Sequence, residues 1–153
     1  MKNKLVSVII NCYNSEQYIK ETIQSVISQT YKNWELIFYD NQSTDDSYII
    51  YKSFKDKRLK YYKSKKFEQL GPARKNALQK AKGDFVAFLD SDDLWEKNKL
   101  KIQLKYFNTK EVGFTISNSI FFKGKKKKLL YPLNKKFKKK VFYDLIKNYF
   151  VSF

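Results

Sequence analysis

The sequence predicts an α/β fold in which a mainly parallel sheet carries helices on both faces. Runs rich in Val, Ile and aromatic residues alternate with helical patterns through residue 107, which is the order expected of parallel strands joined by crossover helices. The 153 residues are enough for one domain with a substantial core. Hydrophobic residues make up 42% of the chain and aromatic residues 18%, which argues against disorder in spite of 31% charged residues.

The first half of the chain contains three of the predicted strands and two helices. Val and Ile dominate 5–10, as in a buried strand, and 34–39 is a similar run. In 16–30, apolar residues recur on one helical face: Ile19, Ile23, Val26 and Ile27. The capping residues of "DNQSTDDS" predict a short helix near 46–54, and "RLKYYK" predicts a third strand at 58–63.

The second half continues the alternation. We predict, in order, a helix at 72–81, a strand at 84–89, a helix at 96–107 and a strand at 112–122. Pro72 suits the first turn of its helix, and Gly83 suits the position beyond the helix end. Asp93 together with Glu96 resembles a capping box for the helix that follows.

Composition excludes several classes of protein and of chemistry. No apolar run reaches the length of a membrane span. The opening "MKNKLVSVIINCYN" lacks a cleavage site, so we interpret it as a buried strand rather than a signal peptide. The single cysteine, Cys12, cannot form an internal disulfide and fits a reducing compartment. The absence of histidine argues against zinc chemistry of the His/Cys kind and leaves carboxylates, Lys, Tyr or Cys as candidate general bases.

The net charge of +17 favours an anionic partner: nucleic acid, a phosphorylated ligand or an acidic membrane surface. The charge is concentrated in 123–140, which contains ten lysines and no acid. A biased genome composition, rich in Lys and Asn, explains the same totals without any partner.

Polar clusters follow the first, second and fourth predicted strands: "NCYN", "DNQSTD" and "DSDD". The carboxyl ends of parallel strands meet at one edge of a sheet, where ligands bind. Asp90 and Asp92 stand one residue apart and suit Mg²⁺ or Mn²⁺, especially where a diphosphate supplies further oxygens. Helix capping is the alternative interpretation of these acids, and we accept it for Asp93.

Three further polar residues have both a ligand interpretation and a structural one. Asp40 and Asn41 follow a strand, where they could hydrogen-bond a base or a ribose; an Asx-turn is the alternative. Arg74 falls in the first turn of its predicted helix, where its charge opposes the helix dipole. A ligand phosphate or a nearby carboxylate would explain Arg74, and so would a solvated surface position.

The order and spacing of these motifs resemble the nucleotide-sugar-binding half of family 2 glycosyltransferases, which have the GT-A fold. The resemblance covers about residues 4–107, from "VSVIINCYN" through "YDNQSTDDS" and "GPARKNAL" to "FLDSDDLW". It implies a nucleotide-sugar-binding GT-A domain at 1–122 and a basic extension at 123–153 that begins the acceptor side.

The resemblance also implies a role for each matching residue. The base and the ribose would be held by Asn11, Tyr13, Asp40 and Asn41. Arg74 would help to order the diphosphate and the acidic loop. Asp90 would approach the ribose or the sugar, and Asp92 would bind the divalent metal, Mn²⁺ or Mg²⁺.

The chain departs from the family pattern in three places. Asn11 stands where Pro or Thr is usual, and Asn41 stands where a second acid is common, so the donors and acceptors offered to the base differ. Family members continue well beyond this length, so the chain resembles a truncated member. The only acids after Glu96 are Glu111 and Asp144, and we assign neither as the catalytic base.

The function implied is that of a metal-dependent inverting glycosyltransferase. It would transfer a sugar from a nucleotide-diphosphate sugar to a hydroxyl of a carbohydrate or lipid-linked acceptor, in bacterial surface polysaccharide or lipo-oligosaccharide synthesis. A truncated, catalytically inactive module that binds nucleotide sugar is one alternative. A basic nucleic-acid-binding protein is another, and the acidic site argues against it because carboxylates repel phosphates unless a metal intervenes.

The lysine-rich extension bears on location. We expect a cytoplasmic protein, and the lysines interleaved with Phe, Tyr and Leu in 123–153 suggest a peripheral site on an anionic membrane, at the inner face of the plasma membrane. The alternative is a solvated basic hairpin followed by an amphipathic helix, on which Val141, Leu145 and Tyr149 share a face.

Overall fold

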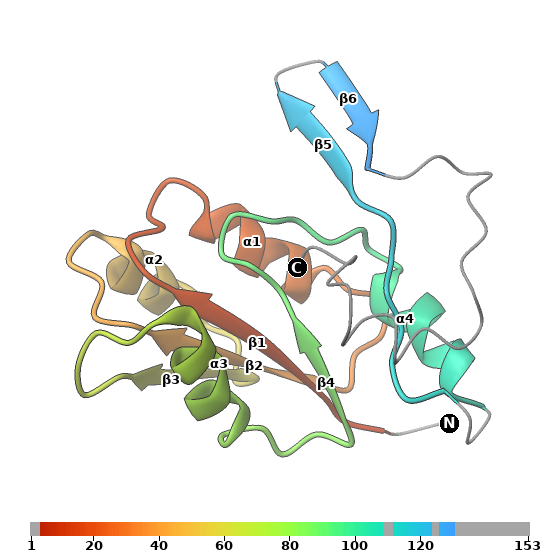
Figure 1. The fold of residues 1–153 in the computed structure, drawn as a ribbon, viewed down its shortest axis with the longest axis horizontal. Coiled ribbons are helices and arrows are strands. Elements are labelled where there is room, and N and C mark those ends of the chain that lie inside the picture. The colour runs from red at the N-terminus through yellow and green to blue at the C-terminus, as the bar shows by residue number, and fades with distance from the viewer. Residues whose placement is uncertain (1–3, 109–111, 124–125, 131–153) are drawn as a thin grey trace. The chain divides into compact units, whose positions relative to one another are not determined.

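The computed structural model describes residues 4–108, 112–123 and 126–130 (Figure 1). The chain divides into two compact units, Met1–Phe114 and Thr115–Phe153, and each is considered by itself. No helix in the described ranges is long and apolar enough to cross a membrane.

The first unit is built on a four-stranded parallel sheet in the order β3-β2-β1-β4. The strands are β1 (Val6–Cys12), β2 (Trp34–Asp40), β3 (Leu59–Lys63) and β4 (Phe85–Phe88). The helices are α1 (Ile19–Ile27), α2 (Ser47–Ser53), α3 (Leu70–Leu78) and α4 (Lys99–Leu104), and the 3₁₀ turn η1 (Lys105–Asn108) follows α4. The predicted alternation and the parallel sheet are confirmed.

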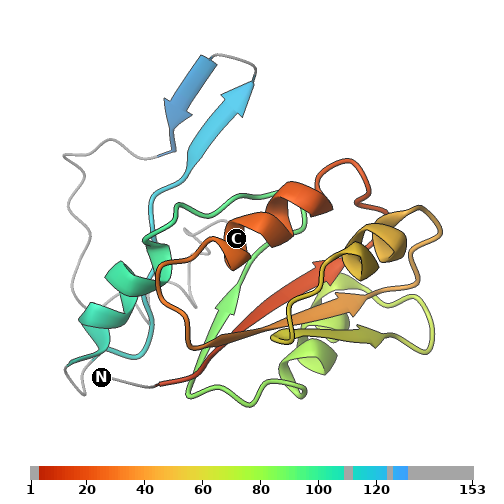
Figure 2. The same cartoon turned by 180° about the vertical axis from the view of Figure 1, so that it is seen from behind.

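Helices cover both faces of this sheet. Figure 1 shows α3 on the near face, and Figure 2 shows α1 and α2 on the other. Alternate residues of β1 therefore enter two different cores: Val8 and Ile10 pack with α1, whereas Ile9 packs with Ala73 and Ala77 of α3. Burial on both sides explains why the strand is continuously apolar in sequence rather than alternating.

The predicted limits of the helices 72–81 and 96–107 are wrong. α3 ends at Leu78 and α4 begins only at Lys99, without a side-chain cap, so Asp93 and Glu96 form no capping box. Gly83 lies at the entry to β4 rather than behind a helix. A Cβ there would stand 2.6 Å from the backbone nitrogen of Ser7, so close approach of two backbones explains the glycine.

The second unit contains an antiparallel pair, β5 (Ile120–Lys123) and β6 (Lys126–Leu129), in which Phe121 faces Lys128. The predicted strand 112–122 is therefore mostly absent. Only Ile120–Phe122 of that range fall in β5, although the Ser119 carbonyl also accepts from the Leu130 N–H at 2.8 Å. The Ser119 N–H donates to the side chain of Asn118 at 3.0 Å. The predicted amphipathic helix around Leu145 lies outside the described residues.

Candidate functional site

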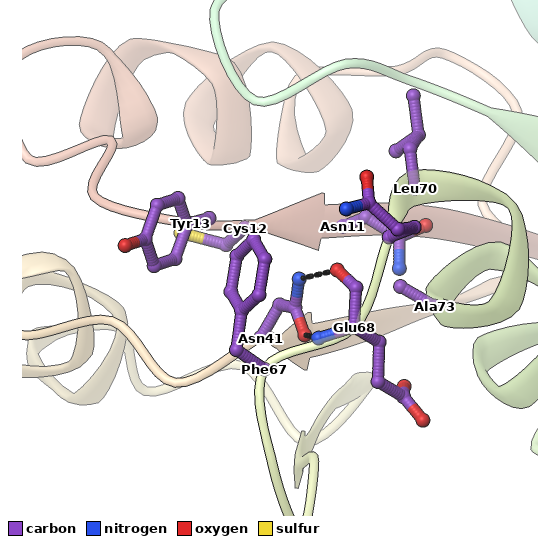
Figure 3. A pocket seen from close by; sticks show the side chains of 9 residues that line it. Asn11, Cys12, Tyr13, Asn41, Phe67, Glu68, Leu70 and Ala73 are labelled. Carbon is purple, nitrogen blue, oxygen red and sulfur yellow. Dashed lines mark hydrogen bonds between the residues drawn. The ribbon is translucent and has the colours of Figure 1, made fainter.

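A pocket of about 260 Å³ opens at the carboxyl ends of β1 and β2. Its walls come from the end of β1, from Asn41, and from residues 67–73 at the start of α3 (Figure 3). The pocket therefore lies at the edge where the polar clusters of the sequence were expected to meet.

Two exposed aromatic rings form one end of the pocket. Tyr13 is 50% exposed and Phe67 is 53% exposed, and their ring centroids lie 4.8 Å apart with planes tilted by 60°. In Figure 3 the two rings lie at one end, with Asn11 and Leu70 at the other. Exposed aromatic faces are suited to stacking on a planar base. Sequence analysis identified Tyr13 but missed Phe67, although an aromatic residue in a lysine-rich loop was a usable signal.

The amide of Asn41 shapes the pocket wall. Its Nδ2 donates to the backbone oxygen of Glu68 at 2.8 Å, and its Oδ1 accepts from the Glu68 backbone N–H at 3.0 Å. The Glu68 carboxylate accepts from Tyr39 at 3.2 Å and from Asn76 at 2.8 Å. Burial, and then the bond to Glu68, raises the pKa of Tyr39. Asn41 thus fixes the loop that carries Phe67.

Asn11 offers an unused donor on the pocket lining. Its Nδ2 is buried, and none of the residues that the structure describes accepts a hydrogen bond from it. A buried donor without a partner is uncommon in a folded protein, so an acceptor atom of a bound ligand would satisfy it.

Asp40 lies at the same sheet edge but does not line the pocket. It is 1% exposed, and its carboxylate accepts from the Tyr61 hydroxyl at 2.6 Å and from the Ser43 backbone N–H at 2.8 Å. Burial, and then the hydrogen bond to Asp40, raises the pKa of Tyr61 well above its ordinary value. The bond to Ser43 reaches three residues along the chain, one further than the Asx-turn considered as the alternative, and it likewise gives Asp40 a role in the local turn.

Arg74 is paired with a carboxylate across the sheet edge. Its Nη2 donates to Asp90 Oδ1 at 2.6 Å, and the two side chains are 26% and 44% exposed. Because α3 begins at Leu70, Arg74 belongs to its second turn rather than to the first. Of the explanations considered for Arg74, the structure shows the nearby carboxylate.

In the acidic loop, residues 90–93, the carboxylate of Asp92 is exposed and unpaired. Asp92 makes no hydrogen bond or ion pair to any described residue. Partial burial, and after it the charges of Asp92 and Asp90, raises the pKa of Asp93. No group of three metal-ligating side chains occurs in the described part of the chain. Hard carboxylate oxygens here therefore suit a divalent cation whose remaining ligands come from a bound molecule.

The loops after β1 and β2 are tied to each other by hydrogen bonds. Asn14 N–H donates to Ser43 Oγ at 3.1 Å, and Ser15 N–H donates to Ser47 Oγ at 2.9 Å. Asn14 adopts a positive φ of 48°, which asparagine tolerates better than most residues. Burial raises the pKa of the Cys12 thiol beneath these loops, so Cys12 stays protonated and is a poor nucleophile.

The comparison with protein families matches residues 7–152 to the model described as "Glycosyl transferase family 2". This chain belongs to glycosyl transferase family 2. The four-stranded parallel sheet with its covering helices is the GT-A fold, as the resemblance implied.

Relatives and solved structures agree with this family. The chain is 44% identical over 115 residues to the Escherichia coli UDP-Glc:alpha-D-GlcNAc-diphosphoundecaprenol beta-1,3-glucosyltransferase WfaP. The aligned region covers 75% of this chain and 46% of WfaP. The chain thus spans about half the length of the relative that it matches.

Two solved structures superpose on the chain. S. aureus TarS 1-349 in complex with UDP-GlcNAc has a TM-score of 0.64 and 34% identity, over 67% of this chain and 31% of that one. The mannosyltransferase PcManGT from Pyrobaculum calidifontis, in complex with GDP-Man and Mn²⁺, has a TM-score of 0.65 and 26% identity, over 71% of this chain and 33% of that one.

Proposed function

We propose that this chain binds a nucleoside diphosphate sugar and serves the transfer of that sugar to an acceptor hydroxyl. The observation that carries the proposal is the juxtaposition at one sheet edge of an aromatic-walled pocket, the Arg74–Asp90 pair and the unpaired carboxylate of Asp92. The names of WfaP and of the TarS complex both contain a UDP-sugar, so we take the donor to be a uridine nucleotide.

Each residue at this edge has a defined part in binding. Tyr13 and Phe67 stack on the base, and Asn11 donates its free amide hydrogen to an acceptor on the base edge. Asn41 sets the pocket wall beside the base and the ribose, and Asp40 supports this edge from beneath, because both hold neighbouring backbone in place.

The remaining residues act on the diphosphate and the sugar. Arg74 orders the acidic loop and attracts the diphosphate, Asp90 approaches the ribose or the sugar, and Asp92 is a ligand of Mn²⁺ or Mg²⁺. When bound, that cation would neutralise the diphosphate and stabilise it as a leaving group. This requires little of the protein: one exposed carboxylate, with the other ligands supplied by phosphate oxygens.

We propose transfer with inversion. The acceptor hydroxyl attacks the anomeric carbon, the bond to the diphosphate oxygen breaks, and a base takes the hydroxyl proton. We assign no base, since Glu111 and Asp144 both lie outside the described residues. The acceptor named for WfaP is lipid-linked, which supports a carbohydrate or lipid-linked acceptor in surface polysaccharide synthesis. The buried free thiol of Cys12 is compatible with the cytoplasm.

The role of Asp92 is tested by Asp92→Asn, which removes a charge with little change of shape. We expect the affinity for UDP in Mn²⁺, measured by titration calorimetry, to fall at least about tenfold, and the affinity in chelator to be low for both proteins. Asp84→Asn is the matched control. It removes a charge directly before β4, at the amino ends of the strands and so away from the proposed site. Equal curves for Asp92→Asn and the parent in Mn²⁺ reject the metal role.

Binding and turnover are separate parts of the proposal. A sugar-transfer assay on the same 153-residue chain distinguishes an active transferase from a module that only binds the nucleotide. Tight oligonucleotide binding that survives Asp92→Asn and falls with salt would favour the nucleic-acid alternative.

A further inference from the structure

The buried side of α1 carries polar residues beside its apolar ones. Thr22 and Gln29, which lies just beyond the end of the helix, are both fully buried, and the half-buried Ser25 lies between them on the same side. These three residues, spaced i, i+3 and i+7, are called the polar stripe below. Polar groups in such positions are costly unless they are hydrogen-bonded, so their partners are informative.

All three residues of the polar stripe bond to the backbone of the segment that contains the acidic loop. Thr22 Oγ1 donates to the Ser91 carbonyl at 3.0 Å, and Ser25 Oγ accepts from the Trp95 N–H at 3.2 Å. Gln29 donates to the Glu96 carbonyl at 2.9 Å and accepts from the Leu100 N–H at 3.1 Å. The segment between β4 and α4 has no ladder or helix of its own, so the polar stripe supplies part of its backbone bonding.

Ser91, the second residue of the acidic loop, is held a second time. Its hydroxyl lies 2.7 Å from the hydroxyl of Ser15, in the loop after β1. Ser91 is thus bound toward α1 through both its carbonyl and its side chain, whereas the preceding Asp90 pairs with Arg74 of α3, on the other face of the sheet. These two anchors fix the chain immediately before Asp92, and the bond from the Trp95 N–H to Ser25 fixes it three residues after Asp92.

We infer that Ser15 and Thr22 are positioning residues, which hold Ser91 so that Asp90 and Asp92 are set for the diphosphate and its cation before the ligand arrives. The inference rests on the proposed function and deepens it, because it names the groups outside the pocket on which the acidic loop depends. Preorganisation of this kind raises affinity, since the loop loses less freedom on binding.

The test compares UDP affinity in Mn²⁺ with UDP affinity in chelator, and takes the ratio as the metal-dependent increment. Ser15→Ala and Thr22→Val should each reduce this ratio about three- to tenfold, as expected for one lost hydrogen bond. Both should leave the affinity in chelator within about twofold, because neither side chain lines the aromatic pocket. Thr22→Ser keeps the hydroxyl and should restore the ratio.

Two further variants control for stability and for the pairing itself. Ser53→Ala removes a hydroxyl that bonds the Ile50 carbonyl on α2, and it should leave the ratio unchanged. The double variant Ser15→Ala, Ser91→Ala should lose no more than either single variant, because the two hydroxyls share one bond. If Thr22→Val reduces the folded fraction, the Ser15 and Ser91 variants decide the matter.

The outcomes separate this inference from the proposed function. A normal increment in Ser15→Ala and Thr22→Val, or an equal loss of affinity with and without Mn²⁺, overturns the positioning role while the proposed function stands. A parent protein whose UDP affinity does not respond to Mn²⁺ contradicts the metal part of the proposed function, and the inference with it.

Discussion

The Asn41 amide uses its oxygen and its nitrogen on the backbone of Glu68, at 3.0 and 2.8 Å. A carboxylate at this position could still accept from the Glu68 N–H, but it could not donate to the Glu68 carbonyl oxygen. It would also place a second negative charge beside the Glu68 side chain. The amide at a position where the family commonly has an acid is therefore matched to this particular wall.

Asn41→Asp should weaken both the fold and the pocket. We expect the free energy of unfolding to fall by about 1–3 kcal/mol, because a buried carbonyl loses its donor, and UDP affinity to fall with it. Chemical denaturation and calorimetry measure the two effects. Asn98→Asp is the control, because Asn98 accepts a bond from Thr30 that aspartate would keep. An Asn41→Asp protein that binds UDP more tightly would instead indicate that residue 41 contacts the base directly.

The raised pKa of Asp93 predicts a pH-dependent cost to stability. The folded protein holds this proton more tightly than the unfolded chain does, so stability contributed by the neutral form is lost as the pH rises through the folded-state pKa. Asp93→Asn should therefore raise the melting temperature, and the gain over the parent should be larger at pH ~7 than at pH ~4. A gain that is the same at both values would show that the charge of Asp93 is not its cause.

At the scale of elements, periodicity and strand composition predicted the alternation of strands and helices through α4. Boundaries were less accurate because they depend on contacts between loops. The first helix begins at Ile19 rather than at residue 16, since the N–H of Ser15 bonds Ser47 and that of Glu16 bonds Asp45. Apolar periodicity could not reveal the polar stripe, because the partners of the stripe lie in a segment far along the chain.

The candidate site was predictable to a similar degree. Parallel topology brought Tyr13, Asn41 and Asp90 to one edge, as expected. The contact between Tyr13 and Phe67 depends on the path of the loop before α3, which in turn depends on the Asn41–Glu68 bonds. The ion pair of Arg74 with Asp90 joins two elements that no local pattern links.

The junction of β1 and β4 is tested by Gly83→Ala. The added methyl would meet the Ser7 backbone nitrogen at 2.6 Å and the Leu5 carbonyl oxygen at 2.8 Å, so the two strands must separate. We expect a loss of about 1–3 kcal/mol in the free energy of unfolding, measured by denaturant titration. Gly71→Ala is the matched control, because nothing lies within 4 Å of a Cβ added at that position. Similar stability in the two variants would contradict the close approach.

At the scale of the whole molecule, the net charge of +17 includes the cluster of lysines after residue 122. In the described part of this region, Phe121 and Phe122 are 61% and 58% exposed, and Lys128 and Lys127, which pair with them across the hairpin, are exposed as well. Basic residues near an anionic bilayer contribute about 1 kcal/mol each, and aromatic residues favour its interface. A membrane surface is one proposal for this region, and a solvated basic hairpin is the other.

Sedimentation with liposomes distinguishes these two proposals. A membrane site predicts that the chain pellets with anionic vesicles but not with neutral ones, that salt releases it, and that deletion of 123–153 abolishes binding. Replacing Lys126, Lys127 and Lys128 by Gln should weaken binding, whereas the same change at Lys57, Lys60 and Lys63 should not. If the full chain stays in the supernatant with anionic vesicles at low salt, the lysines serve solubility instead.

The central place of β1 in the sheet has a consequence for synthesis on the ribosome. β1 lies between β2 and β4, so one of its edges stays unpaired until residues 85–88 have been made. We expect a nascent chain to close the pocket around Tyr13 and Phe67 before the acidic loop has any fixed place. During that interval a strand rich in Val and Ile presents an open edge to neighbouring nascent chains. A chaperone would therefore be most useful to the strand that is synthesised first.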